Sequence, residues 1–307
     1  MNKTNIEYLT HTWNPIAMRC TLISDGCRNC WHLAMAKRLA ANINIDMKMR
    51  IAYAGGSPFL NKKELEVPLH LKKPSRIGVQ FMGDLWHEKI DHFQIAQVWN
   101  IARQCQKHTF FFLTKRPDRL KAWTLVKSEV AQAHLPPIKG DIWPDNCWLG
   151  VSVEDQKTAN KNIPILLQIP AAKRFISVEP MLGPVDLKLM GPGNFSNLKS
   201  CYGEGIHWVI AGGETGPHAR PLHPDWVRSL RDQCQAAGVP FFFKGWGEWA
   251  PCDILHKQGY ALKMPGPVMQ FGEGEYRIPG RGAMMTRCGN KKAGHLIDGK
   301  EYREFPK

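Results

Sequence analysis

The chain has 307 residues, of which 43% are hydrophobic, so it is long enough to bury a large core, and one barrel-sized domain is favoured over two. Lysine and arginine number 41 against 27 aspartates and glutamates, and the formal net charge of +14 attracts polyanions such as a nucleic acid or a nucleotide, with a merely basic surface as the alternative. No apolar run approaches the roughly 20 residues that span a bilayer, and the N-terminus lacks the apolar core of a secretion signal, which argues against a membrane or secreted protein.

The segment from Thr12 to Arg38 carries the strongest chemical signal. Cys20, Cys27 and Cys30 follow the spacing C-x6-C-x2-C, and a helix-like run begins directly after them. Three thiolates close together suit a metal or a cluster that keeps one coordination position open. Three interpretations are available: a [4Fe–4S] cluster, a structural zinc ion with a fourth ligand such as His32, and a turn with three unrelated thiols.

The other six cysteines show no ligand spacing among themselves and are expected to be small buried hydrophobic side chains. Nine is an odd number, and no disulfide pattern is present. This usage predicts a reducing, cytoplasmic compartment and a metal-binding role for the loop cysteines.

Apolar runs recur along the chain and end in polar residues. Continuous rather than alternating apolar runs are typical of parallel strands that are buried on both faces. A first strand is expected near Thr12–Pro15. The others are expected at Arg76–Met82, Thr109–Leu113, Cys147–Val153, Arg174–Val178, His207–Ala211 and Pro240–Phe243.

Helical patterns lie between several of these runs. Leu33–Ala41 has good helix propensity, and apolar residues recur with helical spacing in His92–Cys105. Gln156–Gln168 and Asp225–Ala237 are further candidates. Strands that alternate with helices predict an α/β fold with mostly parallel strands, either a (β/α) barrel or a partial barrel.

Polar residues stand where six of the predicted strands end. In parallel barrels the carboxyl ends of the strands carry the functional site, so we expect these side chains to converge on one mouth together with the cysteine loop. The residues are Asp84, Lys115, Arg116, Ser152, Glu154, Glu179, Glu214 and Lys244.

Two late segments add candidates. Gly212 and Gly213 belong to AGGETG, where backbone N–H groups could approach a ligand closely, although a simple tight turn fits equally well. The run FFFKGWGEW places Trp246 and Trp249 near Lys244, as core residues or as a surface for stacking on a base. Residues 1–250 are expected to form the main domain, and residues 251–307 a C-terminal extension that packs on it.

Several motifs in order resemble one known family. They are TWNPI, the three-cysteine motif, DLWHE (84–88), LTKRPDRL (113–120), WLGVSVEDQ (148–156), FISVEPMLGPVDL (175–187), WVIAGGETGPHARPLHPDWVRSLRDQC (208–234), FFFKGWGEW (241–249) and KKAGHLIDG (291–299). They run through nearly the whole chain. On these motifs the chain resembles the phage-associated family of radical-SAM-like proteins with a three-cysteine motif, whose substrate is unassigned.

The resemblance implies a [4Fe–4S] cluster held by Cys20, Cys27 and Cys30, with S-adenosylmethionine (SAM) on the fourth iron, and a protein that donates electrons. SAM would be cleaved to methionine and a 5′-deoxyadenosyl radical, which abstracts hydrogen from the substrate. The sequence departs from the usual C-x3-C-x2-C spacing, and its Gly-Gly-Glu comes late in the chain. The candidate cofactor contacts are Asp84, Glu179, Gly212, Gly213, Glu214 and Lys244.

The sequence thus predicts a radical-SAM-like iron–sulfur enzyme acting on a nucleic acid or a nucleotide. Lys115, Arg116 and Trp246 are the candidate contacts for the phosphate and the ring of that substrate. One alternative is a non-catalytic nucleic-acid-binding protein with a zinc-stabilised cysteine loop. Another is a hydrolase or nuclease that uses the acidic strand ends with a divalent metal, which leaves the three cysteines without a role.

Overall fold

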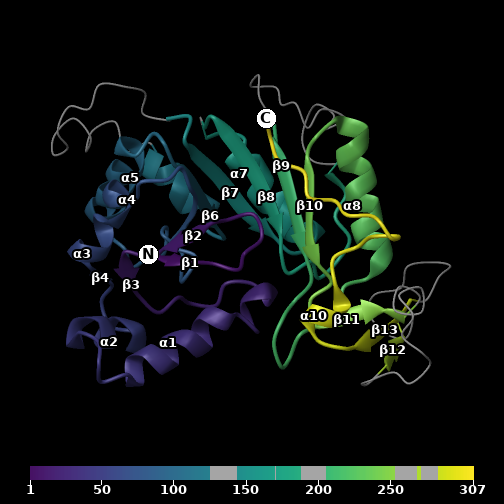
Figure 1. Ribbon diagram of the computed structural model, residues 1–307, viewed down its shortest axis with the longest axis horizontal. Helices are drawn as coiled ribbons and strands as arrows, with labels where there is room; N and C mark the ends of the chain where they lie inside the picture. The colour runs from purple at the N-terminus through teal and green to yellow at the C-terminus, as the bar shows by residue number, and fades with distance from the viewer. Residues whose placement is uncertain (125–143, 170, 188–204, 253–267, 271–282) are drawn as a thin grey trace. The chain divides into compact units, whose positions relative to one another are not determined.

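The structure is a computed structural model (Figure 1) and describes residues 1–124, 144–169, 171–187, 205–252, 268–270 and 283–307. The chain divides into two compact units. The first comprises Met1–Val151 together with Ile165–Arg174, and the second comprises Ser152–Pro164 together with Phe175–Lys307.

The first unit is built on parallel strands. β2 (His11–Trp13) pairs with β5 (Arg76–Val79), β5 with β6 (Thr109–Thr114), and β6 with β7 (Cys147–Val153), while β1 (Asn2–Lys3) joins β2 in antiparallel orientation. Phe110, Phe111 and Phe112 are consecutive in β6 and all three are fully buried. Because neighbouring side chains of a strand point to opposite faces, both faces of this sheet are covered.

A capping box and a shared apolar core define the longer helices of the first unit. α5 (His92–Gln104) starts with a capping box, in which the Asp91 carboxylate accepts from the backbone of Gln94 and the Gln94 side chain accepts from the backbone of Asp91. α1 (Trp31–Ala41) lies beside α2 (Met47–Ala54), and Ala36, Ala52 and Tyr53 form their common core (Figure 1). Short elements complete the unit: β3 (Ile16–Ala17), β4 (Phe59–Leu60), α3 (Lys62–Leu65) and α4 (Val67–His70).

The second unit contains three strands of the same kind. β8 (Lys173–Val178) pairs with β9 (Trp208–Gly212), and β9 with β10 (Phe241–Gly245), both in parallel. α7 (Gln156–Leu166) and α8 (Pro224–Ala237) are its long helices. α8 begins at a proline, which suits the first turn of a helix, and ends at Gly238, whose φ of +65° is the left-handed conformation that glycine adopts readily.

The C-terminal part of the second unit covers the edge of β10. β11 (Trp249–Pro251), β13 (Met284–Arg287) and β12 (Val268–Gln270) form a small antiparallel sheet, and α10 (Asn290–Ala293) follows it. The chain then returns along β10, where the Phe243 N–H donates to Tyr302 O at 2.8 Å and the Glu304 N–H donates to Phe241 O at 3.1 Å (Figure 1). The predicted extension 251–307 stays a prediction, and its residues 253–267 and 271–282 lie outside the described residues.

The main sheet has the strand order β1-β2-β5-β6-β7-β8-β9-β10. The predicted α/β class with mostly parallel strands is therefore confirmed, and the predicted strands and helices are present with small shifts at their ends. Among the described strands this order starts at β1 and ends at β10, and closure into a barrel is not seen. No helix in the described ranges is long and apolar enough to cross a membrane.

Candidate functional site

Consecutive turns position the second and third cysteines of the loop. Residues Asp25–Cys27 form a 3-10 helix, in which the Cys27 N–H donates to Ser24 O at 3.0 Å. The Cys30 N–H then donates to Cys27 O at 3.2 Å, and Cys30 is the residue that precedes α1. Cys27 and Cys30 are thus placed by local backbone geometry, as the short C-x2-C spacing suggests.

Long-range contacts position the first cysteine. The Cys20 N–H donates to His32 Nε2 at 3.2 Å, and Arg116 Nη1 lies 3.7 Å from Cys20 Sγ. Arg116 Nη2 also donates to Thr21 Oγ1 at 2.8 Å and to Thr21 O at 3.4 Å. The loop therefore lies against the carboxyl end of β6, from which Arg116 extends.

Two carboxylates orient Arg116. Its Nη1 donates to Asp84 Oδ2 at 3.1 Å and its Nε to Glu88 Oε2 at 3.0 Å. Asp84 is buried and also accepts from the Thr114 hydroxyl at 2.8 Å and from the backbone N–H of Lys115 at 3.1 Å. Since Asp84 follows β5 and Thr114 ends β6, the parallel pairing of these strands brings the groups together.

Burial and neighbouring charges shift the pKa values around the loop. Burial raises the pKa of the Cys20 thiol to about 11, although the nearby Arg116 charge acts in the opposite direction, and burial also raises the pKa of Cys30. Burial alone would raise the pKa of Glu88, but hydrogen bonds from its own backbone and from the Thr21 hydroxyl lower it to about 2. Burial, with Arg19 nearby, lowers the pKa of His32 to about 4, so this imidazole is neutral at pH 7.

A second cation reaches the loop from the same strand end. Lys115 Nζ donates to Ser24 Oγ at 3.3 Å, and Ser24 Oγ lies 3.3 Å from Cys27 Sγ. Lys115 also acts electrostatically on Cys30 and favours its charged form. Lys115 and Arg116, predicted as substrate contacts, are therefore both directed at the cysteine loop.

The donor chemistry of the loop fits a thiolate-ligated metal group. All three cysteines are free thiols, and Cys27 is close enough to influence the ionisation of both Cys20 and Cys30. Within the described part of the chain, however, no group of three or more His, Cys, Asp or Glu side chains is already gathered tightly enough to hold a metal ion. Binding such a group would require the three sulfurs to draw together.

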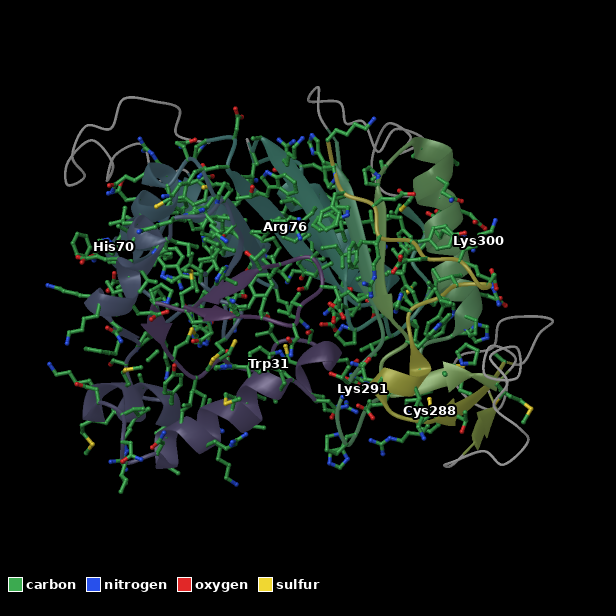
Figure 2. All side chains as sticks on the ribbon, viewed as in Figure 1. Trp31, His70, Arg76, Cys288, Lys291 and Lys300 are labelled. Carbon is green, nitrogen blue, oxygen red and sulfur yellow. The ribbon has the colours of Figure 1, made fainter. Side chains whose placement is uncertain are left out.

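Large apolar side chains are exposed on and beside the loop, together with the charged Asp25 and Arg28. Leu22 is 60% exposed and Ile23 is 47% exposed, both in the segment between the first two cysteines. Trp31, labelled in Figure 2 at the start of α1, is 52% exposed. Trp13, in contrast, is fully buried in the core of the first unit.

In the second unit, Glu179 and Lys244 form an ion pair above Gly212. Glu179 follows β8, Gly212 ends β9, and Lys244 belongs to β10, so the pair joins the ends of β8 and β10 across the strand between them. A Cβ atom at Gly212 would lie 3.4 Å from Lys244 Cβ and 3.6 Å from Glu179 Cδ. These are ordinary van der Waals distances, so the backbone of Gly212 lies directly beneath the stems of the two paired side chains.

The Glu214 carboxylate is held by Arg220. The Arg220 backbone N–H and Nε donate to Glu214 Oε2 at 2.8 and 2.9 Å, and Nη2 donates to Oε1 at 2.7 Å. Glu214 is 7% exposed. Glu154 is also buried, and its backbone carbonyl accepts from Leu182 N–H at 2.7 Å. Glu214 and Glu154 are thus built into the unit, whereas Glu179 and Lys244 are partly exposed.

Gly213 of AGGETG serves loop-to-loop packing. The Gly213 N–H donates to Gly245 O at 2.9 Å, and the Glu248 N–H donates to Glu214 O at 3.0 Å. A Cβ atom at Gly213 would stand 2.0 Å from Trp246 O, so only glycine fits here. The N–H of Gly213 is used within the protein, and the prediction that it approaches a ligand is not supported by this contact.

Trp246 is not a surface for stacking on a base. Its side chain is fully buried, packs against Phe243 with ring centroids 4.9 Å apart, and donates from Nε1 to Leu296 O at 3.0 Å. Trp249 is 7% exposed and donates to Ala219 O. Of the two interpretations of this run, core packing is confirmed and the stacking surface is wrong, because both indoles are buried and find their hydrogen-bond acceptors inside the unit, as buried tryptophans usually do. Figure 2 labels Cys288 and Lys291, which follow β13 in the same unit.

Sequence reasoning named neither Thr21 nor Glu88 as site residues, and considered His32 only as a zinc ligand. In the structure His32 accepts the Cys20 N–H, and Glu88 accepts from both the Thr21 hydroxyl and Arg116 Nε. A weak signal was present, because His32 stands two residues after Cys30 and Glu88 closes the DLWHE motif four residues after Asp84.

A comparison with models of protein families shows which family the chain belongs to. The model of one family matches residues 3–306. The chain belongs to the family described as Protein of unknown function (DUF5131). No curated protein and no solved structure matches it.

Proposed function

We propose that Cys20, Cys27 and Cys30 hold a [4Fe–4S] cluster and that the protein is a radical-SAM-like enzyme of a reducing, cytoplasmic compartment. The observation that supports this best is the placement of two cations on a loop with three free thiols: Arg116 at Cys20 and Lys115 next to the Ser24–Cys27 pair. Thiolate ligands hold iron–sulfur clusters, and neighbouring charges and hydrogen bonds to sulfur tune them.

The residues of the chain have distinct tasks in this proposal. The three thiols lose their protons and bind, and Arg116 and Lys115 balance the negative charge that the thiolates bring. Asp84 and Glu88 keep the guanidinium of Arg116 oriented. When bound, the cluster would supply the electron that cleaves SAM reductively, and an electron donor protein would reduce the cluster again.

The cofactor contacts predicted at the strand ends of the second unit belong to the proposal as well. Both carboxylate oxygens of Glu214 already accept hydrogen bonds from Arg220. Glu179 with its partner Lys244 is therefore the leading candidate for binding the amine or ribose of SAM. Asp84 accepts several hydrogen bonds within the first unit and is better suited to organising the loop. The (β/α) barrel or partial barrel of the radical SAM type is part of the same proposal.

The substrate that we propose is a nucleic acid or a nucleotide. The net charge of +14 supports it, whereas the burial of Trp246 removes the stacking argument. Binding to an oligonucleotide should weaken steeply with salt, in proportion to the phosphates neutralised, while a mononucleotide gives a shallow slope. If neither binds at low salt, the substrate belongs to another class.

Cleavage of SAM tests the proposed function. The protein is reconstituted anaerobically with iron and sulfide, reduced and incubated with SAM, and the release of 5′-deoxyadenosine is measured. We expect slow release even without substrate, none from Cys27→Ala, and normal release from Cys105→Ala, whose thiol is buried outside the loop. Equal release from both variants, or none from the reconstituted wild type, would contradict the proposal.

A further inference from the structure

The three loop cysteines are positioned by two different means. Cys27 and Cys30 are fixed by backbone turns that need no partner elsewhere in the chain. Cys20 is separated from Cys27 by a six-residue segment that carries the exposed Leu22 and Ile23. Bringing the ends of a flexible segment together costs conformational entropy. Cys20 therefore needs an anchor of its own to stay near the other two cysteines.

The anchor is the Cys20–Thr21 peptide, which is held from two sides. His32, in the first turn of α1, accepts the Cys20 N–H and ties the first cysteine to the helix that follows the third. Arg116, which lies 96 residues further along the chain, contacts Cys20 Sγ, Thr21 O and Thr21 Oγ1 with one guanidinium.

Arg116 can act as an anchor because it is itself held. Asp84 and Glu88 each accept one of its N–H groups, and the guanidinium side chain is only 10% exposed. The planar fork of arginine presents five donors in fixed directions, which a lysine ammonium does not reproduce. Arg116→Lys would keep the positive charge, but it would lose the simultaneous hydrogen bonds to Asp84, Glu88 and Thr21.

We propose that Arg116 is a positioning residue, which together with His32 keeps Cys20 in reach of Cys27 and Cys30, so that a bound metal receives three thiolates instead of two. This inference rests on the cysteine ligands of the proposed function, but it concerns the apo protein and any thiophilic metal. Outer residues that orient metal ligands change metal affinity by about 10- to 100-fold when they are replaced.

The test uses Co²⁺ alone, added anaerobically to the reduced apo protein. Each thiol that binds releases its proton, and the intensity of the sulfur-to-cobalt charge-transfer band grows with the number of thiolate ligands. We expect a three-thiolate intensity for wild type and a two-thiolate intensity for Cys20→Ala. Arg116→Lys should resemble Cys20→Ala, with Co²⁺ affinity lowered by about 10-fold or more.

The matched control is Arg38→Lys, the same change at an exposed position of α1, which should keep the three-thiolate intensity. If Arg116→Lys does not fold, Thr21→Val removes the hydroxyl that accepts from Arg116 with little change of shape and should lower Co²⁺ affinity in the same direction. A general loss of structure would remove all thiolate binding, whereas lost positioning removes one ligand of three.

The outcomes separate this inference from the proposed function. Three thiolates on Co²⁺ in Arg116→Lys, at wild-type affinity, would overturn the positioning role and leave the cluster proposal standing. Three thiolates in wild type and two in Arg116→Lys, without any cleavage of SAM by the reconstituted enzyme, would support the positioning role and contradict the radical SAM activity. Fewer than three thiolates in wild type would contradict both.

Discussion

The cysteine loop of the first unit and the strand-end loops of the second unit use their polar groups differently. In the first unit, Asp84 and Glu88 direct Arg116 toward a thiol and a peptide of the loop. In the second unit, Arg220 encloses the Glu214 carboxylate, and backbone bonds interlock the two glycine-rich loops. The polar strand end of the first unit is thus bonded to a loop that carries three thiols, whereas the Glu214 carboxylate is bonded to a residue six positions further along its own loop.

Asp84→Asn should have the largest effect on stability. It removes the buried charge partner of Arg116 and faces the guanidinium with an amide N–H, and breaking a buried ion pair in this way costs about 3–5 kcal/mol of unfolding free energy. Urea unfolding measures the change. Asp25→Asn is the matched control, because the Asp25–Arg28 pair is 71% exposed on both sides and such pairs contribute about 1 kcal/mol or less. Equal losses in both variants would contradict the central place of Asp84.

Gly213→Ala tests the interlocked loops of the second unit. The added methyl group would stand 2.0 Å from the Trp246 carbonyl oxygen, which is backbone and cannot rotate away. Overpacking of this kind costs about 3 kcal/mol, measured by thermal or urea unfolding. Gly216→Ala provides the comparison, since its φ of +101° is strained for alanine but nothing lies within 4 Å of the added atom. A smaller loss of unfolding free energy, about 1 kcal/mol, is expected there. A larger loss in Gly216→Ala than in Gly213→Ala would contradict the packing role of Gly213.

His32 should make the first unit sensitive to acid. Folding lowers its pKa from the ordinary 6.5 to about 4, so between these values the unfolded state binds the extra proton and acidification favours unfolding. The full difference corresponds to about 3 kcal/mol. We expect the unfolding free energy of wild type to fall more than that of His32→Gln between pH 7 and pH 4, and parallel curves would show that His32 is not buried in its neutral form.

Asp298→Asn should have the smallest effect. Arg228 and Arg231 both donate to the Asp298 carboxylate in the C-terminal part of the second unit. Asparagine tolerates the φ of +52° at this position, so the change isolates the partly exposed ion pairs, worth about 1 kcal/mol or less. The hydrogen bond from Arg228 lowers the pKa of Asp298, so its stabilisation is present at pH 7 and is lost as the pH falls below the ordinary 3.8. A difference from wild type that persists at pH 2 would contradict this origin.

The fold was predictable from the sequence where local pattern decides it. Continuous apolar runs such as Phe110–Phe112 predict strands buried on both faces, and α5 carries both a helical period and a capping signal. The sequence predicts loops and a short helix within residues 42–75, which is the region of α2 but without its bounds, and the small sheet of β11, β12 and β13 was missed, because short segments with mixed polarity have no clear period.

The site was predictable in its residue types and less so in its connections. The spacing of Cys20, Cys27 and Cys30 is visible in the sequence, while the contact between Cys20 and Arg116 joins positions 96 residues apart and depends on the pairing of β5 with β6. The aromatic run around Trp246 fitted either the core or a stacking surface. The hydrogen bond from its indole N–H to Leu296 O, a distant residue that the sequence does not connect with it, places this side chain in the core.

The iron and acid-labile sulfide content of anaerobically purified protein tests whether Cys20, Cys27 and Cys30 hold a [4Fe–4S] cluster. We expect about four irons and four sulfides per chain, with the absorbance of a [4Fe–4S] centre, and their loss in Cys20→Ala, Cys27→Ala and Cys30→Ala. One zinc ion per chain without sulfide, or full iron retention in all three variants, would contradict it.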